Sequence, residues 1–425
     1  MKFTEAVDFL YSQLPMYQRQ GAVAYKKDLS NTIFLLEKLG NPHFKFKSVH
    51  IAGTNGKGSS AHFIASILQS AGYKVGLYTS PHLKSFTERI KINGKEVKED
   101  FVSNFVENIK PLLKKISPSF FEITVAMAFD YFGKEEIDIA VVEVGLGGRL
   151  DSTNVLMPEV SLITNISYDH TDLLGITLEQ IANEKAGIIK NSRPVVIGKR
   201  QDEIAHIFNT RAKAESAKIY FASDEIKLKP LNNVFTILKF DKIWLESINL
   251  PIKTDYIVEN LPGVLQTIIL LRQRGFQITD EAIIEGILHM PEMTGLKGRW
   301  QKLNDKPLII CDVAHNLDGI MKVLVEIKKI KYDKLFIVWG YVKDKDVDPI
   351  FAVLPKNAIY YFCQPDIPRA MNATLLRQKA ENAGLTGFAI PKVTEAFQQA
   401  VRSAKADDFI FVGGSTFVVA ELENL

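Results

Sequence analysis

Residues 48–60 read Ser48-Val-His-Ile-Ala-Gly-Thr-Asn-Gly-Lys-Gly-Ser-Ser60, and a helical apolar pattern follows over Ala61–Ser70. This order predicts a strand, a glycine-rich loop and a helix. The glycines at 53, 56 and 58 allow successive N–H groups to turn inward around an anion, and the helix directs its positive end at the same point. The stretch therefore predicts a phosphate cradle, in which Lys57 adds a cation and Ser59 a hydroxyl for Mg²⁺ or a phosphate oxygen.

The match to the standard P-loop is partial. That template places a glycine five residues before Gly56 and a hydroxyl directly after the lysine, whereas this chain has Ile51 and Gly58 there. A plain glycine-rich turn remains the alternative interpretation.

Length and composition limit the class of protein. A chain of 425 residues exceeds one ordinary core, and we expect two domains. A net charge of +3 does not indicate a nucleic-acid partner, and no apolar run approaches the ~20 residues of a membrane span. The first ten residues resemble an amphipathic helix more than a signal peptide, so we expect a cytoplasmic protein. Cys311 and Cys363 lack the spacing of a zinc site or a disulfide framework.

Apolar, β-branched runs alternate with helical patterns, which predicts an α/β fold. We expect a P-loop-type ATPase domain with a mostly parallel sheet over residues 1–292, and a smaller Rossmann-like α/β domain over residues 293–425. The first contains an antiparallel ribbon at 233–249. The pattern breaks at Pro291–Gly298, which we interpret as a linker and hinge.

Two predicted strands end in polar side chains. Glu143 ends the run 137–145, and its position at the carboxyl end of a buried strand favours a Mg²⁺ carboxylate. The next run, Val160–Ile166, leads to Asp169 and His170. From spacing alone, His170 is more often a hydrogen-bonding residue than a Mg²⁺ ligand. Lys185 lies on a later predicted helix, and its plain interpretation is an exposed lysine. If its amine carried CO₂ as a carbamate, the side chain would end in an anion that could help to hold a metal.

Several motifs together resemble one family. They are Gly53-Thr-Asn-Gly-Lys-Gly-Ser59, Thr79-Ser-Pro-His82, Glu143 with Gly145–Asp151, Asp169-His-Thr-Asp172 and Glu184-Lys-Ala-Gly187. This order resembles the folylpolyglutamate/dihydrofolate synthases of bacteria, in the Mur ligase superfamily. The resemblance covers nearly the whole chain.

The resemblance implies roles for individual residues. Ser80, Glu143 and His170 would bind Mg²⁺ at two sites, with Lys185 as a carbamylated lysine and room for a monovalent cation. Lys57, Glu143, His170 and Lys185 would be the catalytic residues. The nucleotide would contact the following positions: Gly53, Thr54, Asn55, Gly56, Lys57, Gly58, Ser59, Asn260, Arg299, Asp312 and His315.

The reaction that the resemblance implies is ATP-dependent amide formation. The carboxylate of a folate or dihydropteroate would be phosphorylated by ATP, and L-glutamate would attack the acyl phosphate. The acceptor would contact Phe121 and Glu122, the segment Leu150-Asp151-Ser152, and the loop 16–28. From the residues alone, a core role for Phe121 and a cap or turn role for Asp151 stay open. We expect a monomer.

Two rival functions share the cradle. A Mur-type ligase would add an amino acid to a UDP-linked cell-wall precursor, but the form of the glycine loop and the short N-terminal region favour folate. A nucleotide switch of the GTPase kind would carry an Asn-Lys-x-Asp tetrad, which the sequence lacks. The chain departs from the family pattern at Tyr256-Ile257, where His-Gln is frequent, and at Val313, where Gly is frequent.

Overall fold

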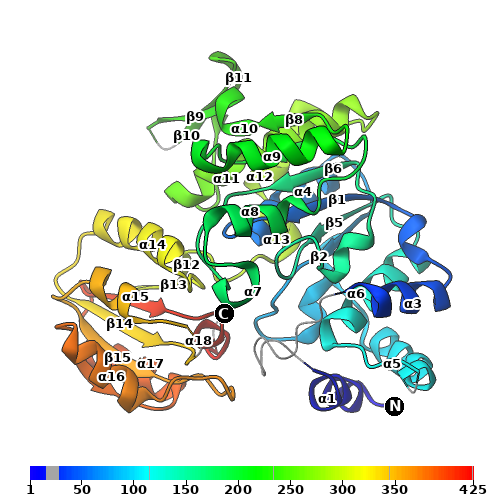
Figure 1. Ribbon diagram of the computed structural model, residues 1–425. Helices are drawn as coiled ribbons and strands as arrows, with labels where there is room; N and C mark the ends of the chain where they lie inside the picture. Colours follow the sequence, from blue (N-terminus) through cyan, green and yellow to red (C-terminus); the bar gives the residue numbers. More distant parts are fainter. Residues whose placement is uncertain (16–27, 114, 233, 344, 424) are drawn as a thin grey trace. The chain divides into compact units, whose positions relative to one another are not determined.

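The computed structural model describes residues 1–15, 28–113, 115–232, 234–343, 345–423 and 425 (Figure 1). Most of the loop 16–28, expected to contact the acceptor, lies outside these residues. The described chain forms two compact units, one ending at Leu296 and the other running from Lys297 to Leu425. Each is described separately.

The first unit is built on an eight-stranded sheet in the order β4-β3-β2-β5-β1-β6-β7-β8. Strands β2 and β5 to β8 run parallel to β1, while at one edge β3 pairs antiparallel with β2 and β4 pairs antiparallel with β3. The prediction of a mostly parallel sheet is confirmed. The strands are β1 (Lys47–Ala52), β2 (Val75–Tyr78), β3 (Ile90–Ile92), β4 (Lys95–Glu96), β5 (Ile139–Glu143), β6 (Val160–Ile163), β7 (Val195–Ile197) and β8 (Ile219–Phe221).

Both faces of this sheet are covered by helices. Val49 and Ile51 of β1 pack with α4 and α11 on one face, and Val142 of β5 packs with α5 and α6 on the other. The helices are α1 (Phe3–Gln13), α3 (Ser30–Lys38), α4 (Lys57–Ser70), α5 (Glu99–Leu113), α6 (Phe120–Lys134), α7 (Thr171–Leu174), α8 (Leu178–Ala186), α9 (Asp202–Ala214), α10 (Ala222–Glu225), α11 (Asp255–Gln273), α12 (Asp280–Leu288) and α13 (Met290–Thr294). Short 3₁₀ turns are η2 (Pro42–Phe44), η3 (Phe86–Arg89) and η4 (Ser152–Val155).

Helix α4, which follows the glycine loop, is buried along most of its length. Helix α12 packs closely on it, because a Cβ at Gly286 would lie 2.4 Å from the Cα of Ile67. The helix that is expected to face the phosphates is therefore held within the core of the first unit.

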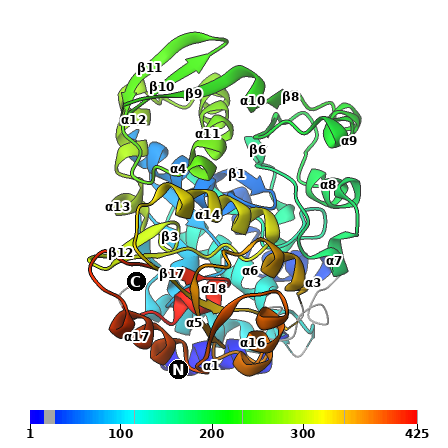
Figure 2. The ribbon, with the colours of Figure 1, turned by 90° about the vertical axis from the view of Figure 1, so that its left-hand side faces the viewer.

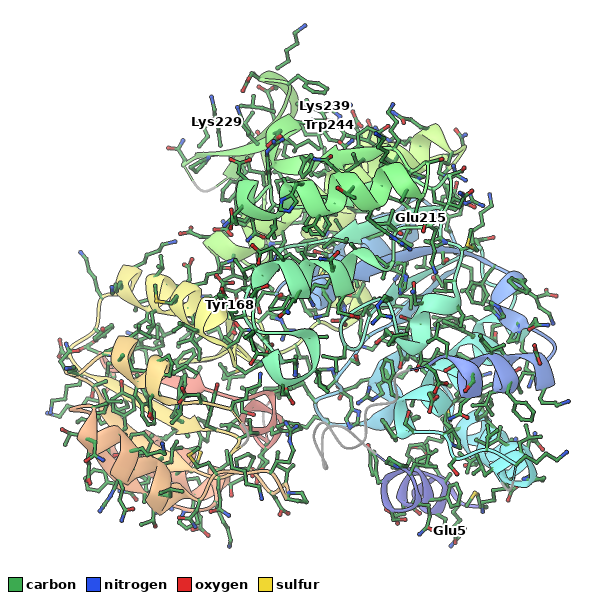
Figure 3. The ribbon with its side chains drawn as sticks, in the orientation of Figure 1. Glu5, Tyr168, Glu215, Lys229, Lys239 and Trp244 are labelled. Atoms are coloured by element: carbon green, nitrogen blue, oxygen red, sulfur yellow. The ribbon has the colours of Figure 1, made fainter. Side chains whose placement is uncertain are left out.

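The antiparallel ribbon consists of β9 (Ile226–Leu231), β10 (Val234–Lys239) and β11 (Lys242–Ile248) in the order β11-β10-β9. It lies beside α11 and α12 (Figure 2). Its apolar side chains join the core through Ile237 and Leu245, while the side chain of Lys229 is exposed (Figure 3). The sequence pattern predicts β10 and β11 but misses β9.

The expected linker at Pro291–Gly298 begins with a short helix, α13, in which Pro291 takes a position near the helix start that tolerates proline. Its end is fixed to the first unit. Lys91 Nζ donates to the Thr294 carbonyl oxygen (2.9 Å), and Thr294 Oγ1 lies 2.7 Å from His62 Nδ1. These contacts explain why the first unit extends beyond residue 292.

The second unit has a six-stranded sheet in the order β12-β13-β17-β14-β15-β16, in which β12 is antiparallel and the other strands are parallel. This confirms the smaller Rossmann-like α/β fold. Its elements are β12 (Gln301–Asp305), β13 (Leu308–Cys311), α14 (Leu317–Lys329), β14 (Leu335–Gly340), α15 (Asp348–Val353), β15 (Ile359–Cys363), α16 (Ala373–Asn382), β16 (Thr386–Ala389), α17 (Val393–Ser403), β17 (Phe409–Gly413) and α18 (Thr416–Ala420).

No helix among the described residues is sufficiently long and apolar to cross a membrane.

Candidate active site

Strand order brings three chain segments to one sheet edge. Strand β1 lies between β5 and β6, with Ile51 paired to Glu143 and Ala52 paired to Ile163. The glycine loop, the end of β5 and the segment after β6 therefore meet where connections leave on opposite sides, which is where ligands bind in open α/β sheets.

The glycine loop forms a cradle that side chains would fill. Gly53 and Gly56 have φ values of +143° and +83°. A Cβ would lie 1.9 Å from Thr164 Oγ1 at Gly53, and 2.3 Å from Asn260 Oδ1 at Gly56. Gly56 is the N-cap of α4 and supplies no capping side chain, so the first N–H groups of the helix face outward without an intrahelical acceptor. This arrangement suits phosphate oxygens.

Three polar residues after β6 hold the loop in this shape. Asn165 accepts from the Asn55 N–H (3.1 Å) and donates to the Asn55 carbonyl oxygen (2.9 Å). Thr164 Oγ1 donates to the same oxygen (2.7 Å), and the Ser167 N–H donates to Thr54 Oγ1 (3.0 Å). The sequence pattern does not indicate these residues, and it predicts a strand that extends to Ile166. The strand ends at Ile163 because the next residues turn toward the loop.

Two lysines lie at the cradle. Lys57 Nζ donates to the Thr54 carbonyl oxygen (3.2 Å), and Lys185 Nζ donates to the Gly53 carbonyl oxygen (2.8 Å). Lys185 is only 4% exposed, so the residue-based interpretation of an exposed lysine is wrong. Burial, aided by the charge of Lys57, lowers the pKa of Lys185 to about 7, against the opposing effect of Asp169.

The candidate metal ligands come from three segments of the chain: the loop after β2, the end of β5 and the start of α7. The Ser80 N–H donates to Glu143 Oε2 (3.1 Å), and Glu143 is buried. His170 has a left-handed backbone (φ 50°), and its Nε2 lies 3.7 Å from Asp169 Oδ2. The neighbouring Tyr168 is exposed (Figure 3). Within the described parts of the chain, no three His, Cys, Asp or Glu side chains group closely enough to hold a metal by themselves.

The predicted acceptor residues have different surroundings. Phe121 is half-buried and lies against Gly145, where a Cβ would be 2.3 Å from its ring. Glu122 is buried and accepts from the Ser119 N–H (2.6 Å) in the capping box of α6. Asp151 is buried and caps η4, accepting from the Leu146 N–H (2.8 Å) and the Thr153 N–H (3.0 Å). Leu150 is half-buried and Ser152 buried.

Burial raises the pKa of Asp151, while its hydrogen bonds counter that rise. Glu122 and Asp151 thus have structural hydrogen bonds that account for their burial, and Phe121 and Leu150 present the more accessible surface.

Asn260 and the residues predicted in the second unit have defined local contacts. Asn260 lies on α11 against Gly56. In the second unit, the buried Asp312 accepts from the N–H groups of Trp300 and Ala314, both over 2.8 Å. Arg299 Nη1 donates to the Gly298 carbonyl oxygen (3.2 Å), and His315 Nδ1 lies 3.1 Å from the Val313 carbonyl oxygen. Asp312 therefore joins the segments that carry Arg299 and His315.

Two family models match this chain. The Mur ligase middle domain matches residues 51–266, and the Mur ligase glutamate ligase domain matches residues 298–416. The chain belongs to the Mur ligase family.

Among curated relatives of this Mur ligase, the folylpolyglutamate synthase of Lacticaseibacillus casei is 30% identical over 100% of this chain and 98% of that one. A probable bifunctional folylpolyglutamate synthase/dihydropteroate synthase of Halobacterium salinarum is 34% identical over 99% of this chain. The chain spans about half the length of that relative (51%) and of a similar one from Haloferax volcanii (50%).

Solved Mur ligase structures have the same fold. E. coli FolC in complex with DHPP and ADP superimposes with a TM-score of 0.86 at 29% identity, covering 99% of this chain and 96% of that one. A bifunctional folylpolyglutamate synthase/dihydrofolate synthase with Mn, AMPPNP and L-glutamate bound gives 0.84 at 28% identity, covering 99% and 97%. The resemblance to folylpolyglutamate/dihydrofolate synthases is confirmed.

The Mur ligase contains a further, partly buried cluster that the sequence pattern indicates only in part. Arg89 Nε donates to His82 Nδ1 (2.7 Å), and the Tyr11 hydroxyl lies 3.0 Å from His82 Nε2. Burial, aided by Arg89, lowers the pKa of His82 well below its usual value. The motif Thr79-Ser-Pro-His82 indicates one member of the cluster, but its partners are not adjacent in sequence.

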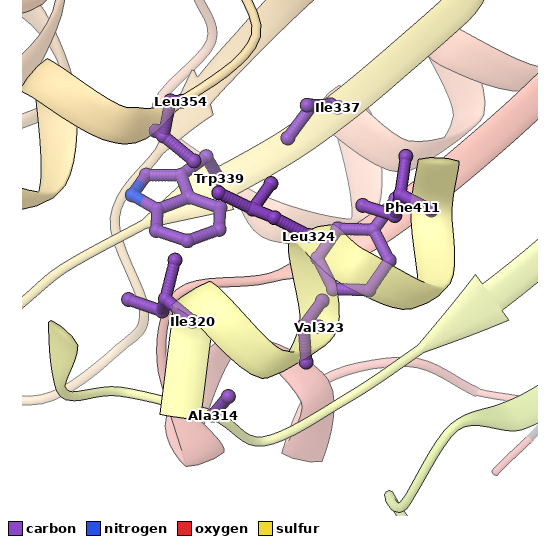
Figure 4. A pocket seen from close by; sticks show the side chains of 9 residues that line it. Ala314, Ile320, Val323, Leu324, Ile337, Trp339, Leu354 and Phe411 are labelled. Carbon is purple, nitrogen blue, oxygen red and sulfur yellow. The ribbon is translucent and has the colours of Figure 1, made fainter. Parts of the chain in front are cut away.

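A pocket in the second unit is lined by apolar side chains of α14, β14 and β17, among them Ile320, Leu324, Trp339 and Phe411 (Figure 4). A lining of this kind does not suit phosphate, so we do not assign the nucleotide to it.

Proposed function

We propose that this Mur ligase joins L-glutamate to the carboxylate of a folate or dihydropteroate, using ATP and forming an acyl phosphate. The observation that carries the proposal is the glycine cradle at the start of α4, in a fold shared with a FolC structure that holds ADP and DHPP.

Phosphorylation overcomes the poor reactivity of a carboxylate as an acyl donor. The acceptor carboxylate attacks the γ-phosphorus of ATP, ADP leaves, and the acyl phosphate then has a good leaving group. The amine of glutamate attacks its carbonyl carbon and phosphate departs. Lys57 and the N–H groups of α4 stabilise the charge on the transferred phosphoryl group.

The residues around the cradle fit a divalent cation, because Ser80 and Glu143 offer oxygen and His170 offers nitrogen. We assign Mg²⁺ to these three residues at two sites, with a carbamate on Lys185 completing the second. Bound Mg²⁺ supplies charge neutralisation for the phosphates. The contact of the buried Lys185 amine with the Gly53 carbonyl oxygen supports this assignment, because it places the amine beside the glycine cradle. We propose a monovalent cation as a further cofactor of the same site.

The nucleotide and the acceptor are assigned to different sets of residues. We place the nucleotide on residues 53–59 and Asn260, with Arg299, Asp312 and His315 contributing from the second unit. We place the acceptor near Phe121, Leu150 and Ser152, with Glu122 and Asp151 shaping the pocket through their hydrogen bonds. A planar ring can stack on Phe121.

The test is phosphate release from ATP in the presence of L-glutamate and one acceptor, followed by the mass of the product. The acceptors are dihydropteroate, tetrahydrofolate and a UDP-muramyl peptide. A product heavier by one glutamate residue with either of the first two supports the proposal. Turnover with the UDP-muramyl peptide alone would overturn it in favour of cell-wall precursor ligation.

A further inference from the structure

A buried chain of hydrogen bonds runs from β1 to the acceptor loop. His50 Nε2 lies 2.8 Å from Thr153 Oγ1, and Thr153 Oγ1 donates to Asp151 Oδ1 over 2.5 Å. His50 and Thr153 are 0% exposed and Asp151 is 3% exposed. Neither His50 nor Thr153 is a residue to which we have given a role in binding or catalysis.

The proton positions in this chain follow from counting donors. A hydroxyl has one proton, and Thr153 gives it to the Asp151 carboxylate. Its oxygen must therefore accept from His50, which fixes the proton of the imidazole on Nε2. His50 Nδ1 then lacks a proton, and among the described residues it has no hydrogen-bond partner.

The charge state of His50 agrees with this assignment. Burial, aided by the charge of Lys190, lowers the pKa of His50 to about 3, so the ring is neutral. Lys190 itself donates to the Asn154 carbonyl oxygen (2.7 Å), one residue after Thr153. The imidazole therefore acts as a fixed neutral donor.

The Asp151 carboxylate connects this hydrogen-bond chain to the loop after Glu143. Its Oδ2 accepts from the Leu146 N–H at the start of the loop, and its Oδ1 accepts from the Thr153 N–H and hydroxyl at the end. With Oδ1 occupied twice, the carboxylate has one orientation, and it holds Leu146 directly after Gly145, which lies against Phe121.

We propose that His50 and Thr153 are positioning residues that orient the Asp151 carboxylate and thereby shape the site for the acceptor's heteroaromatic ring. This inference rests on the proposed function and specifies which buried residues set its acceptor affinity. The position of His50 on β1, three residues before Gly53, allows its effect to be separated from that of the nucleotide loop, because its hydrogen bond leads away from the cradle.

The variants for the test remove or keep single donors. Thr153→Val removes the hydroxyl at constant shape, and Thr153→Ser keeps it. His50→Leu removes the donor at the other end, and His50→Gln offers an amide N–H in its place. Ser103→Ala is the matched control, since the buried Ser103 hydroxyl on α5 donates to the Glu99 carbonyl oxygen (3.0 Å) of its own helix.

The measurements are KM for dihydropteroate, KM for ATP and the unfolding midpoint of each purified full-length variant. For Thr153→Val and His50→Leu we expect KM for dihydropteroate to rise about tenfold, the scale of one buried hydrogen bond, with KM for ATP within about twofold. Thr153→Ser and His50→Gln should restore most of the acceptor affinity. The control should lose stability without this selective change.

A merely structural pair would give a different result. Unchanged acceptor KM, or equal changes for dihydropteroate and ATP, would overturn the inference while wild-type turnover leaves the proposed function standing. If the wild type ligates glutamate to neither dihydropteroate nor tetrahydrofolate, both the inference and the proposed function are overturned. Should Thr153→Val fail to fold, His50→Leu and the two conservative variants decide by the same KM comparison.

Discussion

The Lys185 amine donates a hydrogen bond to the Gly53 carbonyl oxygen over 2.8 Å, which ties α8 to the first residue of the glycine cradle. Lys185 is buried, and Lys57 is close enough to lower its pKa. A buried amine beside a second lysine is costly as a cation, and a carbamate would give this side chain the opposite charge.

Lys185→Ala should therefore lower ligase turnover by about a hundredfold, the scale of losing one electrostatic contact in an active site. Added formate or acetate should restore part of it, because a small carboxylate can occupy the space of a carbamate. The control is Lys91→Ala, which also removes a buried amine that donates to a backbone carbonyl, that of Thr294 (2.9 Å). Full activity in Lys185→Ala without additive would eliminate the carbamate.

Gly56→Ala should weaken ATP binding, because the new Cβ would lie 2.3 Å from Asn260 Oδ1 and the φ of +83° disfavours an L side chain. We expect KM for ATP to rise at least about tenfold. Gly72→Ala separates the two effects, since Gly72 has a φ of +88° with no atom within 4 Å of the added Cβ.

That control should cost about 1 kcal/mol of stability, the scale of left-handed strain, and leave KM for ATP unchanged. A similar rise in KM for both variants would show that general destabilisation, and not the shape of the cradle, explains the result.

The cradle could be predicted from the sequence because its elements are local. Three glycines, one lysine and the change from a strand to a helical pattern all fall within residues 48–70. The placement of Glu143 at the same edge follows from its position at the end of an apolar run, since parallel strands present their carboxyl ends together.

The partners of the loop could not be predicted in the same way. Asn55 and Asn165 are 110 residues apart and meet only because β1 pairs with β6. The burial of Lys185 likewise depends on which side of α8 faces the sheet, and a nine-residue helix with mixed polarity leaves that undecided. Long-range strand order, rather than local propensity, determines both.

His50 should make the stability of the protein depend on pH. Its pKa is about 3 in the folded state, against about 6.5 in an unfolded chain, because burial and Lys190 oppose the charged ring. Below pH 6.5 the unfolded state binds the additional proton, so this contribution to stability is lost as pH falls from 6.5 toward 3, by up to about 1.4 kcal/mol per pH unit.

The free energy of unfolding from urea titrations at pH 4.5 to 7.5 should therefore fall less steeply toward acid in His50→Gln than in the wild type. The difference between the two curves isolates this residue from other buried histidines. Parallel curves would contradict a neutral, buried His50.

Asp312 and Asp408 offer a matched comparison in the second unit. Each is buried and accepts two backbone N–H groups: Asp312 from Trp300 and Ala314, and Asp408 from Lys334 and Lys405. Truncating either to alanine should cost about 1–3 kcal/mol, because buried donors lose their acceptor.

Only Asp312→Ala should also raise KM for ATP, because Asp312 holds the segments that carry Arg299 and His315, whereas Asp408 precedes β17 at the opposite end of the strand from Gly413. Urea titration and ATP-dependent kinetics on both variants separate the two effects. If Asp408→Ala raises KM for ATP as much as Asp312→Ala does, the change reflects loss of stability, and the assignment of Asp312 to the nucleotide fails.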